Sequence, residues 1–196
     1  ILGEAGIGKS RLSFEFRNSI TDDNVFFLES HCAADTREKP FAPLVEIVRR
    51  SFRIEINASR DEVERRLSQG LEMLGIPADQ SLPYLMNLLG HSPTGIDIDQ
   101  IAGEALGIRT RNAVIALFRE RCRITPTILI VEDLRWIDSA SQALLTRVIE
   151  EEGNLALLVI TTARTGYTPP WAEAECATIL NLTPLSSTGT EALIQG

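Results

Sequence analysis

The sequence of 196 residues is poor in cysteine and histidine, and it has no long apolar run. Its three cysteines are far apart and form no C-x-x-C pair, which excludes a disulfide framework and a cysteine-based zinc site. We therefore expect reduced thiols in a cytoplasmic protein. The two histidines, His31 and His91, have no companion at metal-ligand spacing, so we expect no special role for either. No apolar run approaches the ~18 residues that a membrane span requires, so we expect no contact with a membrane.

Basic residues are outnumbered by acidic ones. The 27 acidic and 19 basic residues give a net charge of −8, which argues against direct nucleic-acid binding by this domain. Only two basic residues are lysines, Lys9 and Lys39, so the place of each is informative. The composition, 44% hydrophobic and 23% charged, is that of a soluble globular domain. The chain has no initiator methionine and starts beside a glycine-rich stretch, so we expect one domain over residues 1–196 that is truncated within its first strand.

Four short apolar runs have the length and the β-branched content of buried strands. They span residues 25–28, 128–131, 155–162 and 178–182. Because these runs are continuously apolar rather than alternating, they favour a sheet that is covered on both faces. Helical patterns lie between them, so the sequence predicts an α/β fold with βαβ units and a doubly wound parallel sheet.

The stretch from residue 41 to residue 123 shows helical patterns and no convincing strand. We therefore expect residues 41–123 to form a mostly helical insertion between the second and third strands. Its middle, residues 78–103, contains Pro83, Pro93 and several glycines, so we predict a loop-rich and mobile segment there.

The strongest motif is a phosphate-binding loop. Residues 3–10 match the pattern G-x-x-x-x-G-K-[ST] at every fixed position. Glycines allow backbone N–H groups to wrap a phosphate, and the following helix presents its N-terminus to the anion. Lys9 would reach the β- and γ-phosphates, and the Ser10 hydroxyl would bind Mg²⁺. The eight residues predicted to hold the nucleotide are Gly3, Glu4, Ala5, Gly6, Ile7, Gly8, Lys9 and Ser10.

Two acids, Glu132 and Asp133, end the apolar run at residues 128–131. This is a Walker B pattern, in which carboxylates at the C-terminal edge of a buried strand hold Mg²⁺ and polarise water. Adjacent residues of a strand point to opposite sides, so the two acids cannot share one role. By position Glu132 would face the metal and Asp133 the attacking water, although the residue types are swapped relative to the usual order. Both therefore stay candidate metal ligands.

An arginine, Arg164, follows the next apolar run in the segment T-T-A-R. Its guanidinium would either contact the γ-phosphate through a bidentate fork or pair with a surface acid. Just after the two acids, we expect Trp136 to pack against the core. Asp138 is expected to cap the helix that follows it.

Several segments together resemble a known family: GEAGIGKSR, ILIVEDLRWIDSAS, LLVITTAR and LNLTPLS are similar to the AAA-like ATPase domain of STAND signalling ATPases. Such domains occur in large bacterial transcription activators resembling the maltose regulator and in multidomain adenylate/guanylate cyclases. The resemblance implies a P-loop NTPase three-layer sandwich with parallel strand order 5-1-4-3-2. It implies ATP or ADP with Mg²⁺ on residues 3–10, and Arg11 just beyond. It also implies that Glu132 is the metal-directed acid, Asp133 the water-directed acid and Arg164 the sensor.

Members of that family act as switches, so the resemblance implies a regulatory module that hydrolyses Mg-ATP slowly. Its partners would be the nucleotide, the C-terminal helical and effector domains of a parent chain, and other copies in a nucleotide-dependent oligomer. Only the start of a terminal helix, at residues 190–194, is expected here. Two alternatives stay open. One is a nucleotide-holding scaffold with negligible turnover, and the other is a P-loop small-molecule kinase with residues 109–111 as an arginine lid.

Overall fold

The chain forms a mixed α/β fold in which helices cover a parallel sheet. The structure is a computed structural model and describes residues 1–22, 24–151 and 155–184. The terminal helix predicted at residues 190–194 lies outside this part of the chain. The predicted α/β class and parallel strands are confirmed.

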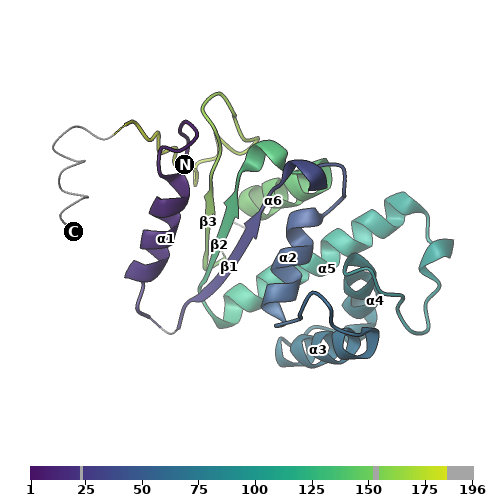
Figure 1. Ribbon diagram of the computed structural model, residues 1–196. Helices are drawn as coiled ribbons and strands as arrows, with labels where there is room; N and C mark the ends of the chain where they lie inside the picture. Colours follow the sequence, from purple (N-terminus) through teal and green to yellow (C-terminus); the bar gives the residue numbers. More distant parts are fainter. Residues whose placement is uncertain (23, 152–154, 185–196) are drawn as a thin grey trace.

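Three strands pair in the order β1-β2-β3, with both pairs parallel (Figure 1). They are β1 (Phe26–His31), β2 (Thr127–Glu132) and β3 (Leu157–Thr161). The central strand β2 is buried along its length except at Glu132, its last residue, which is partly exposed. A continuous apolar strand between two neighbours places that single acid at the C-terminal edge of the sheet.

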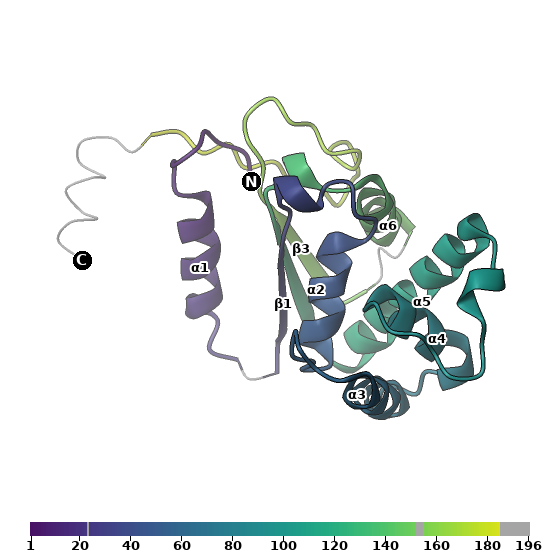
Figure 2. The same cartoon turned by 45° about the vertical axis from the view of Figure 1, so that its right-hand side comes forward.

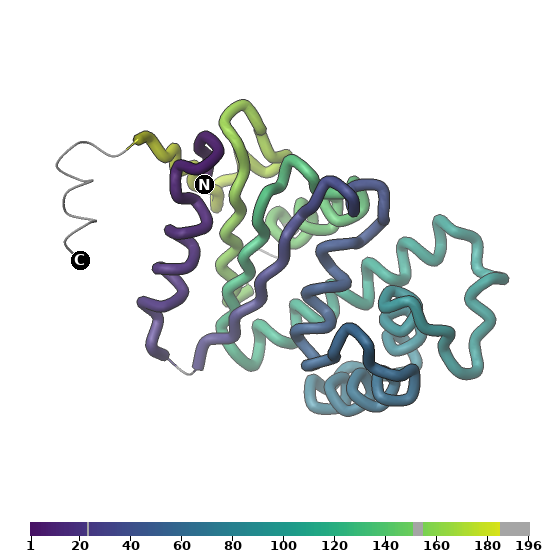
Figure 3. The backbone as a smooth tube through the Cα atoms, viewed as in Figure 1, coloured from purple at the N-terminus to yellow at the C-terminus, as the bar shows by residue number. Residues whose placement is uncertain are grey.

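The start of the chain lies beside β3 without forming a named strand. Leu2 makes isolated parallel bridges to Ala163 and to Asn181. The first residues therefore run next to residues 180–182, as the backbone trace shows (Figure 3). The strand predicted at residues 178–182 is reduced to the bridge at Asn181. These two neighbours of Leu2 are those required by the five-strand order 5-1-4-3-2, which as a statement about five strands stays a prediction.

Helices lie on both sides of the sheet. The helix α1 (Lys9–Ser19) is on one side, and α2 (Ala42–Ser51) and α6 (Ser139–Glu151) are on the other (Figure 2). Short 3-10 helices occupy connections: η1 (Ala34–Thr36), η2 (Ile98–Gln100) and η3 (Leu134–Trp136). The first two residues of α1 are the last two of the phosphate-loop motif, and the bond from Ser10 to Glu132 places the N-terminus of α1 at the same edge of the sheet as the end of β2.

Between β1 and β2 the described elements are helices. After α2 come α3 (Arg60–Met73), α4 (Ala78–Leu88) and α5 (Gly103–Ile124), and α4 packs against both α3 and α5. Their apolar faces share one core, in which the fully buried side chains include Val63, Leu67, Leu71, Leu85, Met86 and Val114. That residues 41–123 are a separate insertion unit stays a prediction.

The expectation of a loop-rich segment at residues 78–103 is wrong for its first part, because α4 occupies residues 78–88 with Pro83 inside the helix. Proline in a helix interior costs about 3 kcal/mol through a lost N–H bond and a steric clash. Tyr84, Leu85 and Met86 are each buried, and burying such side chains contributes about 1.5–3 kcal/mol apiece. Packing against α3 and α5 therefore outweighs the proline.

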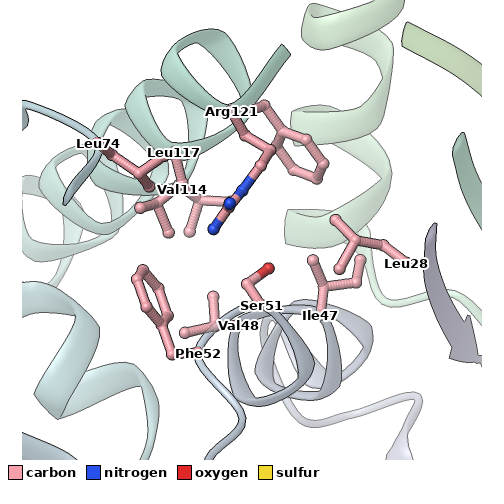
Figure 4. Close-up of a pocket in the computed structure, with 10 residues that line it drawn as sticks. Leu28, Ile47, Val48, Ser51, Phe52, Leu74, Val114, Leu117 and Arg121 are labelled. Carbon is pink, nitrogen blue, oxygen red and sulfur yellow. The ribbon is translucent and has the colours of Figure 1, made fainter. Parts of the chain in front are cut away.

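The helices α2 and α5 pack beside the sheet with little space between them. A gap of about 10 Å³ lies between α2 and α5, which is room for one water at most. Ser51 and Arg121 reach into it among apolar side chains (Figure 4). Arg121 lies over the ring of Phe26 at 4.5 Å, and burial lowers the pKa of its guanidinium. This gap is a packing imperfection and offers no ligand site.

Candidate functional site

The phosphate-loop motif forms a tight curl that leads into α1. Gly6 and Gly8 have φ of 78° and 105°, and Gly8 is the N-cap of α1. A Cβ at either position would meet no atom within 4 Å, so these glycines are needed for backbone conformation and not for space. Gly3 differs: a Cβ there would lie 2.8 Å from Ile7 Cγ2, which is too close.

The Lys9 side chain folds back into this curl. Its Nζ donates to the carbonyl oxygens of Gly3 and Glu4, both at 2.8 Å, and the residue is only 9% exposed. An ammonium group has three N–H donors, so two of them close the loop. The charge of Lys9 is thereby held at the centre of the loop, while Glu4, Ala5 and Gly6 form its exposed outer part.

The loop and the central strand are joined by one side-chain hydrogen bond. Ser10 Oγ donates to Glu132 Oε2 at 3.1 Å. The two residues are far apart in sequence, and the parallel topology brings them to one edge of the sheet. The Glu132 side chain is 12% exposed and offers a carboxylate beside the hydroxyl of the loop.

His31 lies at the same point, a contact that the spacing of the histidines did not indicate. Its Nε2 is 2.8 Å from Glu132 Oε2. The cause is the strand register, because His31 and Glu132 are directly paired at the ends of β1 and β2. The sequence contained a usable signal: His31 follows the apolar run at residues 25–28 by the few residues that carry a strand to the sheet edge.

Asp133 differs from Glu132 in backbone conformation and exposure. It adopts the left-handed conformation with φ of 58°, which Asp tolerates better than most residues, and it is exposed. Its backbone N–H donates to Thr162 Oγ1 at 3.1 Å, which ties the end of β2 to the end of β3. The two neighbouring acids thus differ in backbone conformation and exposure, and their separate roles stay a prediction.

Arg164 follows a residue that is hydrogen-bonded to the loop. Ala163 accepts from the Gly3 N–H at 3.3 Å and donates its own N–H to the Ile1 carbonyl at 3.0 Å. Arg164 comes next and is exposed, while the Thr165 hydroxyl donates to the Glu4 carboxylate. The end of β3 and the loop therefore form one continuous rim.

Arg11 is turned along the helix surface instead of toward the loop. Its guanidinium pairs with Glu15 at 2.5 Å, one turn further along α1, and its side chain is 70% exposed. An exposed pair of this kind is weak, at about 0.2–0.5 kcal/mol. The pairing therefore leaves Arg11 free to exchange partners.

The residues at this edge fit an anion together with a hard cation. The N-terminus of α1 has neither a side-chain cap nor an acid in its first turn, so its N–H groups are available to an oxyanion. Ser10 and Glu132 supply oxygen ligands, which Mg²⁺ prefers. Among the described residues no group of three or more His, Cys, Asp or Glu side chains could hold a metal alone. Mg²⁺ would therefore need phosphate oxygens to complete its coordination, which is its usual mode.

Cys32 adjoins this edge but is not a nucleophile. Burial, together with the nearby acids Asp138, Asp133 and Glu46, raises the pKa of its thiol to about 12. The reactive form of a cysteine is the thiolate. Cys32 is therefore protonated at neutral pH, which disfavours thiolate chemistry there.

A glycine-rich loop opening a helix, beside an acid at the end of a buried parallel strand, defines the P-loop class of nucleotide-binding domains. The sequence comparison is more specific. Residues 1–160 match the family described as the AAA ATPase domain, and the chain belongs to that family.

A relative by sequence is an uncharacterized protein of Rhizobium meliloti (strain 1021), 26% identical over 198 residues. The alignment covers all of this chain and 19% of that protein, so the chain spans about a fifth of this relative's length. No solved structure matches the sequence. Within the described ranges, no helix has both the length and the apolar character needed to cross a membrane.

Proposed function

We propose that this domain binds Mg-ATP, hydrolyses it slowly and acts as a nucleotide-operated switch of the STAND type in a longer signalling protein. The observation that carries the proposal is the 3.1 Å hydrogen bond from Ser10 Oγ to Glu132 Oε2. This contact joins the phosphate loop to the acid at the end of the central strand, the two parts that a Mg-nucleotide site requires. Membership of the AAA ATPase domain family supports nucleotide binding.

In this proposal the backbone of residues 3–10 and the Lys9 ammonium hold the phosphates. Two of the three Lys9 donors already close the loop, so the ammonium is held in place before the nucleotide arrives. Ser10 and Glu132 are the protein ligands of Mg²⁺, and the ion neutralises charge on the phosphate oxygens. The conformational entropy of these side chains is lost during folding and not on binding, which favours nucleotide binding.

Two exposed residues at the same edge of the sheet take the remaining catalytic roles. Asp133 orients the attacking water and accepts its proton, and Arg164 contacts the γ-phosphate as the sensor. Asp133 is exposed, and its N–H donates to Thr162, just after β3. Arg164 is exposed and follows Ala163, whose carbonyl accepts from the N–H of Gly3 in the loop. Arg11 would exchange its weak pairing with Glu15 for a contact with the nucleotide.

Nucleotide titration with Mg²⁺ and with EDTA tests the binding step. Lys9→Ala is expected to abolish ATP binding, whereas Lys39→Ala, which removes an exposed lysine, is expected to leave it unchanged. In single-turnover hydrolysis, Asp133→Asn is expected to slow the reaction roughly 100-fold or more. An unchanged rate would show that Asp133 is not the base. Equal ATP affinity of wild type and Lys9→Ala would refute the proposal as a whole.

A second candidate is a scaffold that holds nucleotide with negligible turnover. The observation in its favour is that the Asp133 carboxylate, in the described part of the chain, accepts no hydrogen bond that would aim it at a water. Single-turnover measurement separates the two candidates. The scaffold predicts tight Mg-ATP binding with hydrolysis no faster in wild type than in Lys9→Ala.

No observation favours the small-molecule kinase. Its arginine lid would be residues 109–111, and these lie inside α5. Arg109 donates to the Tyr84 hydroxyl at 3.0 Å and lies over that ring, which fastens α5 to α4. This segment is therefore part of a packed helix pair.

The switch role concerns parts of a longer protein, so it is proposed from the family resemblance. Nucleotide state would change how the C-terminal helical and effector domains are arranged, and copies would assemble when ATP is bound. Light scattering of the longest soluble form with ADP and with ATP checks the assembly. An identical mass in both states would contradict a nucleotide-dependent oligomer.

A further inference from the structure

One histidine and one carboxylate form a pair that the roles proposed above do not use. His31 Nε2 and Ser10 Oγ both lie within hydrogen-bond distance of the same oxygen, Glu132 Oε2, at 2.8 Å and 3.1 Å. At this contact distance an N–H on Nε2, in a neutral or a charged imidazole, attracts the carboxylate oxygen. We propose that His31 is a positioning residue that holds the Glu132 carboxylate for Mg²⁺, an inference that rests on the proposed function.

The backbone that carries His31 is fixed from two sides. The His31 N–H donates to Glu46 Oε2 on α2 at 3.1 Å, and the next N–H, of Cys32, donates to the Glu132 carbonyl at 2.9 Å. Arg50 in turn holds the other oxygen of Glu46 at 2.8 Å. The imidazole therefore projects from an anchored strand end, although its own side chain is 60% exposed.

The residue type at position 132 explains why such a restraint is useful. Glutamate has one more rotatable bond than aspartate, so its carboxylate loses more rotamer freedom when it binds a metal. The imidazole limits this freedom before the metal arrives, because it holds one carboxylate oxygen beside Ser10. Glu132 and His31 together do what a shorter acid does by itself.

The pair contributes little to folding, because an ion pair with a mostly exposed partner is weak. If His31 had a purely structural role, replacing it would therefore leave the metal affinity unchanged. A positioning role gives a specific effect, which is weaker metal binding with unchanged metal-free nucleotide binding. Residues that orient a metal ligand typically change metal affinity by roughly 10–100-fold.

The test measures Mn²⁺ affinity by electron paramagnetic resonance in the presence of ADP, in the longest form of the protein that purifies as a soluble species. His31→Ala is expected to weaken Mn²⁺ binding roughly tenfold and to leave ADP affinity in EDTA unchanged. His31→Gln, which retains an N–H donor, is expected to stay close to wild type. His91→Ala removes the other histidine, far from the site in sequence, and is the matched control.

Repeating His31→Ala in a Glu132→Asp variant tests whether the change in Mn²⁺ affinity depends on the contact between these two residues. In Glu132→Asp the shorter acid draws away from His31, so adding His31→Ala is expected to change Mn²⁺ affinity little further. Wild-type Mn²⁺ affinity in His31→Ala, or the same loss in both backgrounds, overturns the inference. If His31→Ala fails to fold, a tenfold loss in His31→Gln overturns it as well. ADP binding that is insensitive to Lys9→Ala would instead refute the proposed function.

Discussion

At the scale of single residues, the two lysines occupy opposite environments. Lys9 is 9% exposed and bonds two loop carbonyls, whereas Lys39 is exposed after η1. A compact ammonium fits inside the curl, and a planar guanidinium does not. We expect Lys9→Arg to weaken ATP binding at least roughly tenfold, which is about 1.4 kcal/mol, and Lys39→Arg to be silent. Isothermal titration calorimetry measures both. Equal affinities would contradict the phosphate-loop interpretation.

The three cysteines differ in reactivity for reasons visible in their surroundings. Burial raises the pKa values of the Cys32 and Cys122 thiols, that of Cys32 to about 12, and both side chains are shielded from solvent. Cys176 is exposed. We expect a maleimide to label Cys176 first at pH 8, and the other two only after unfolding. Peptide mass spectrometry identifies the labelled site, and early labelling of Cys32 would contradict its burial.

At the scale of elements, Asp138 links two helices around the site. Its Oδ1 accepts from Ser141 N–H, which confirms the predicted cap of α6, and also from the N–H of Phe41, the N-cap of α2, both at 2.9 Å. Its Oδ2 accepts from the Ser141 hydroxyl at 2.6 Å. The carboxylate is buried and holds Phe41 in the left-handed conformation, with φ of 65°.

Removing this carboxylate would leave two buried N–H groups without partners. We expect Asp138→Ala to lower the free energy of unfolding by about 2–4 kcal/mol. Asp138→Asn keeps an acceptor for both N–H groups, and we expect a loss of about 1 kcal/mol. Urea denaturation measures both variants. Asp133→Asn, an exposed neighbour, is the control, and equal effects of the two Asp138 variants would contradict the capping argument.

The strands show how far apolar patterns predict this fold. The run at residues 128–131 lies wholly within β2, and the run at residues 25–28 overlaps β1. β1 continues through Glu29, Ser30 and His31 because backbone pairing with β2 does not depend on apolar side chains. The run at residues 178–182 forms only one bridge, since a ladder needs a partner and the partner there is the single residue Leu2. The apolar pattern of the sequence therefore predicted neither the extension of β1 to His31 nor the single bridge in the run at residues 178–182.

At the scale of the whole molecule, the site is assembled from segments that are distant in sequence. The contact of the loop motif with Glu132 could be predicted, because the C-terminal ends of parallel strands share one sheet edge. The contact of His31 with Glu132 depends on strand register. The bond from Phe41 to Asp138 depends on how α2 packs beside α6. Such long-range geometry is not encoded in a local pattern, so these contacts required the structure.

One large apolar hollow lies beside α1 and β3. A cavity of about 490 Å³ lies between α1, β3 and the segment that leads to Asn181. Apolar side chains line most of it, among them Leu12, Phe16, Val159 and Trp171. In the described residues β3 pairs with β2 on one side, and on its other side the first residues bond to its end, through Ile1 to the Thr161 carbonyl and through the bridge of Leu2 to Ala163. Open strand edges and apolar hollows favour aggregation.

We therefore expect these 196 residues, expressed alone, to melt at low temperature, to aggregate and to bind a hydrophobic dye such as ANS. The dye is expected to enter the hollow, so Leu12→Ser, which places a hydroxyl in the lining, should weaken its binding. Phe14→Ser is the matched control, because Phe14 lies on the same helix, is 56% exposed and does not line the hollow. Thermal melting and dye fluorescence measure these effects. A sharp, reversible melt without dye binding would show that the hollow closes, and equal responses of the two serine variants would place the dye elsewhere.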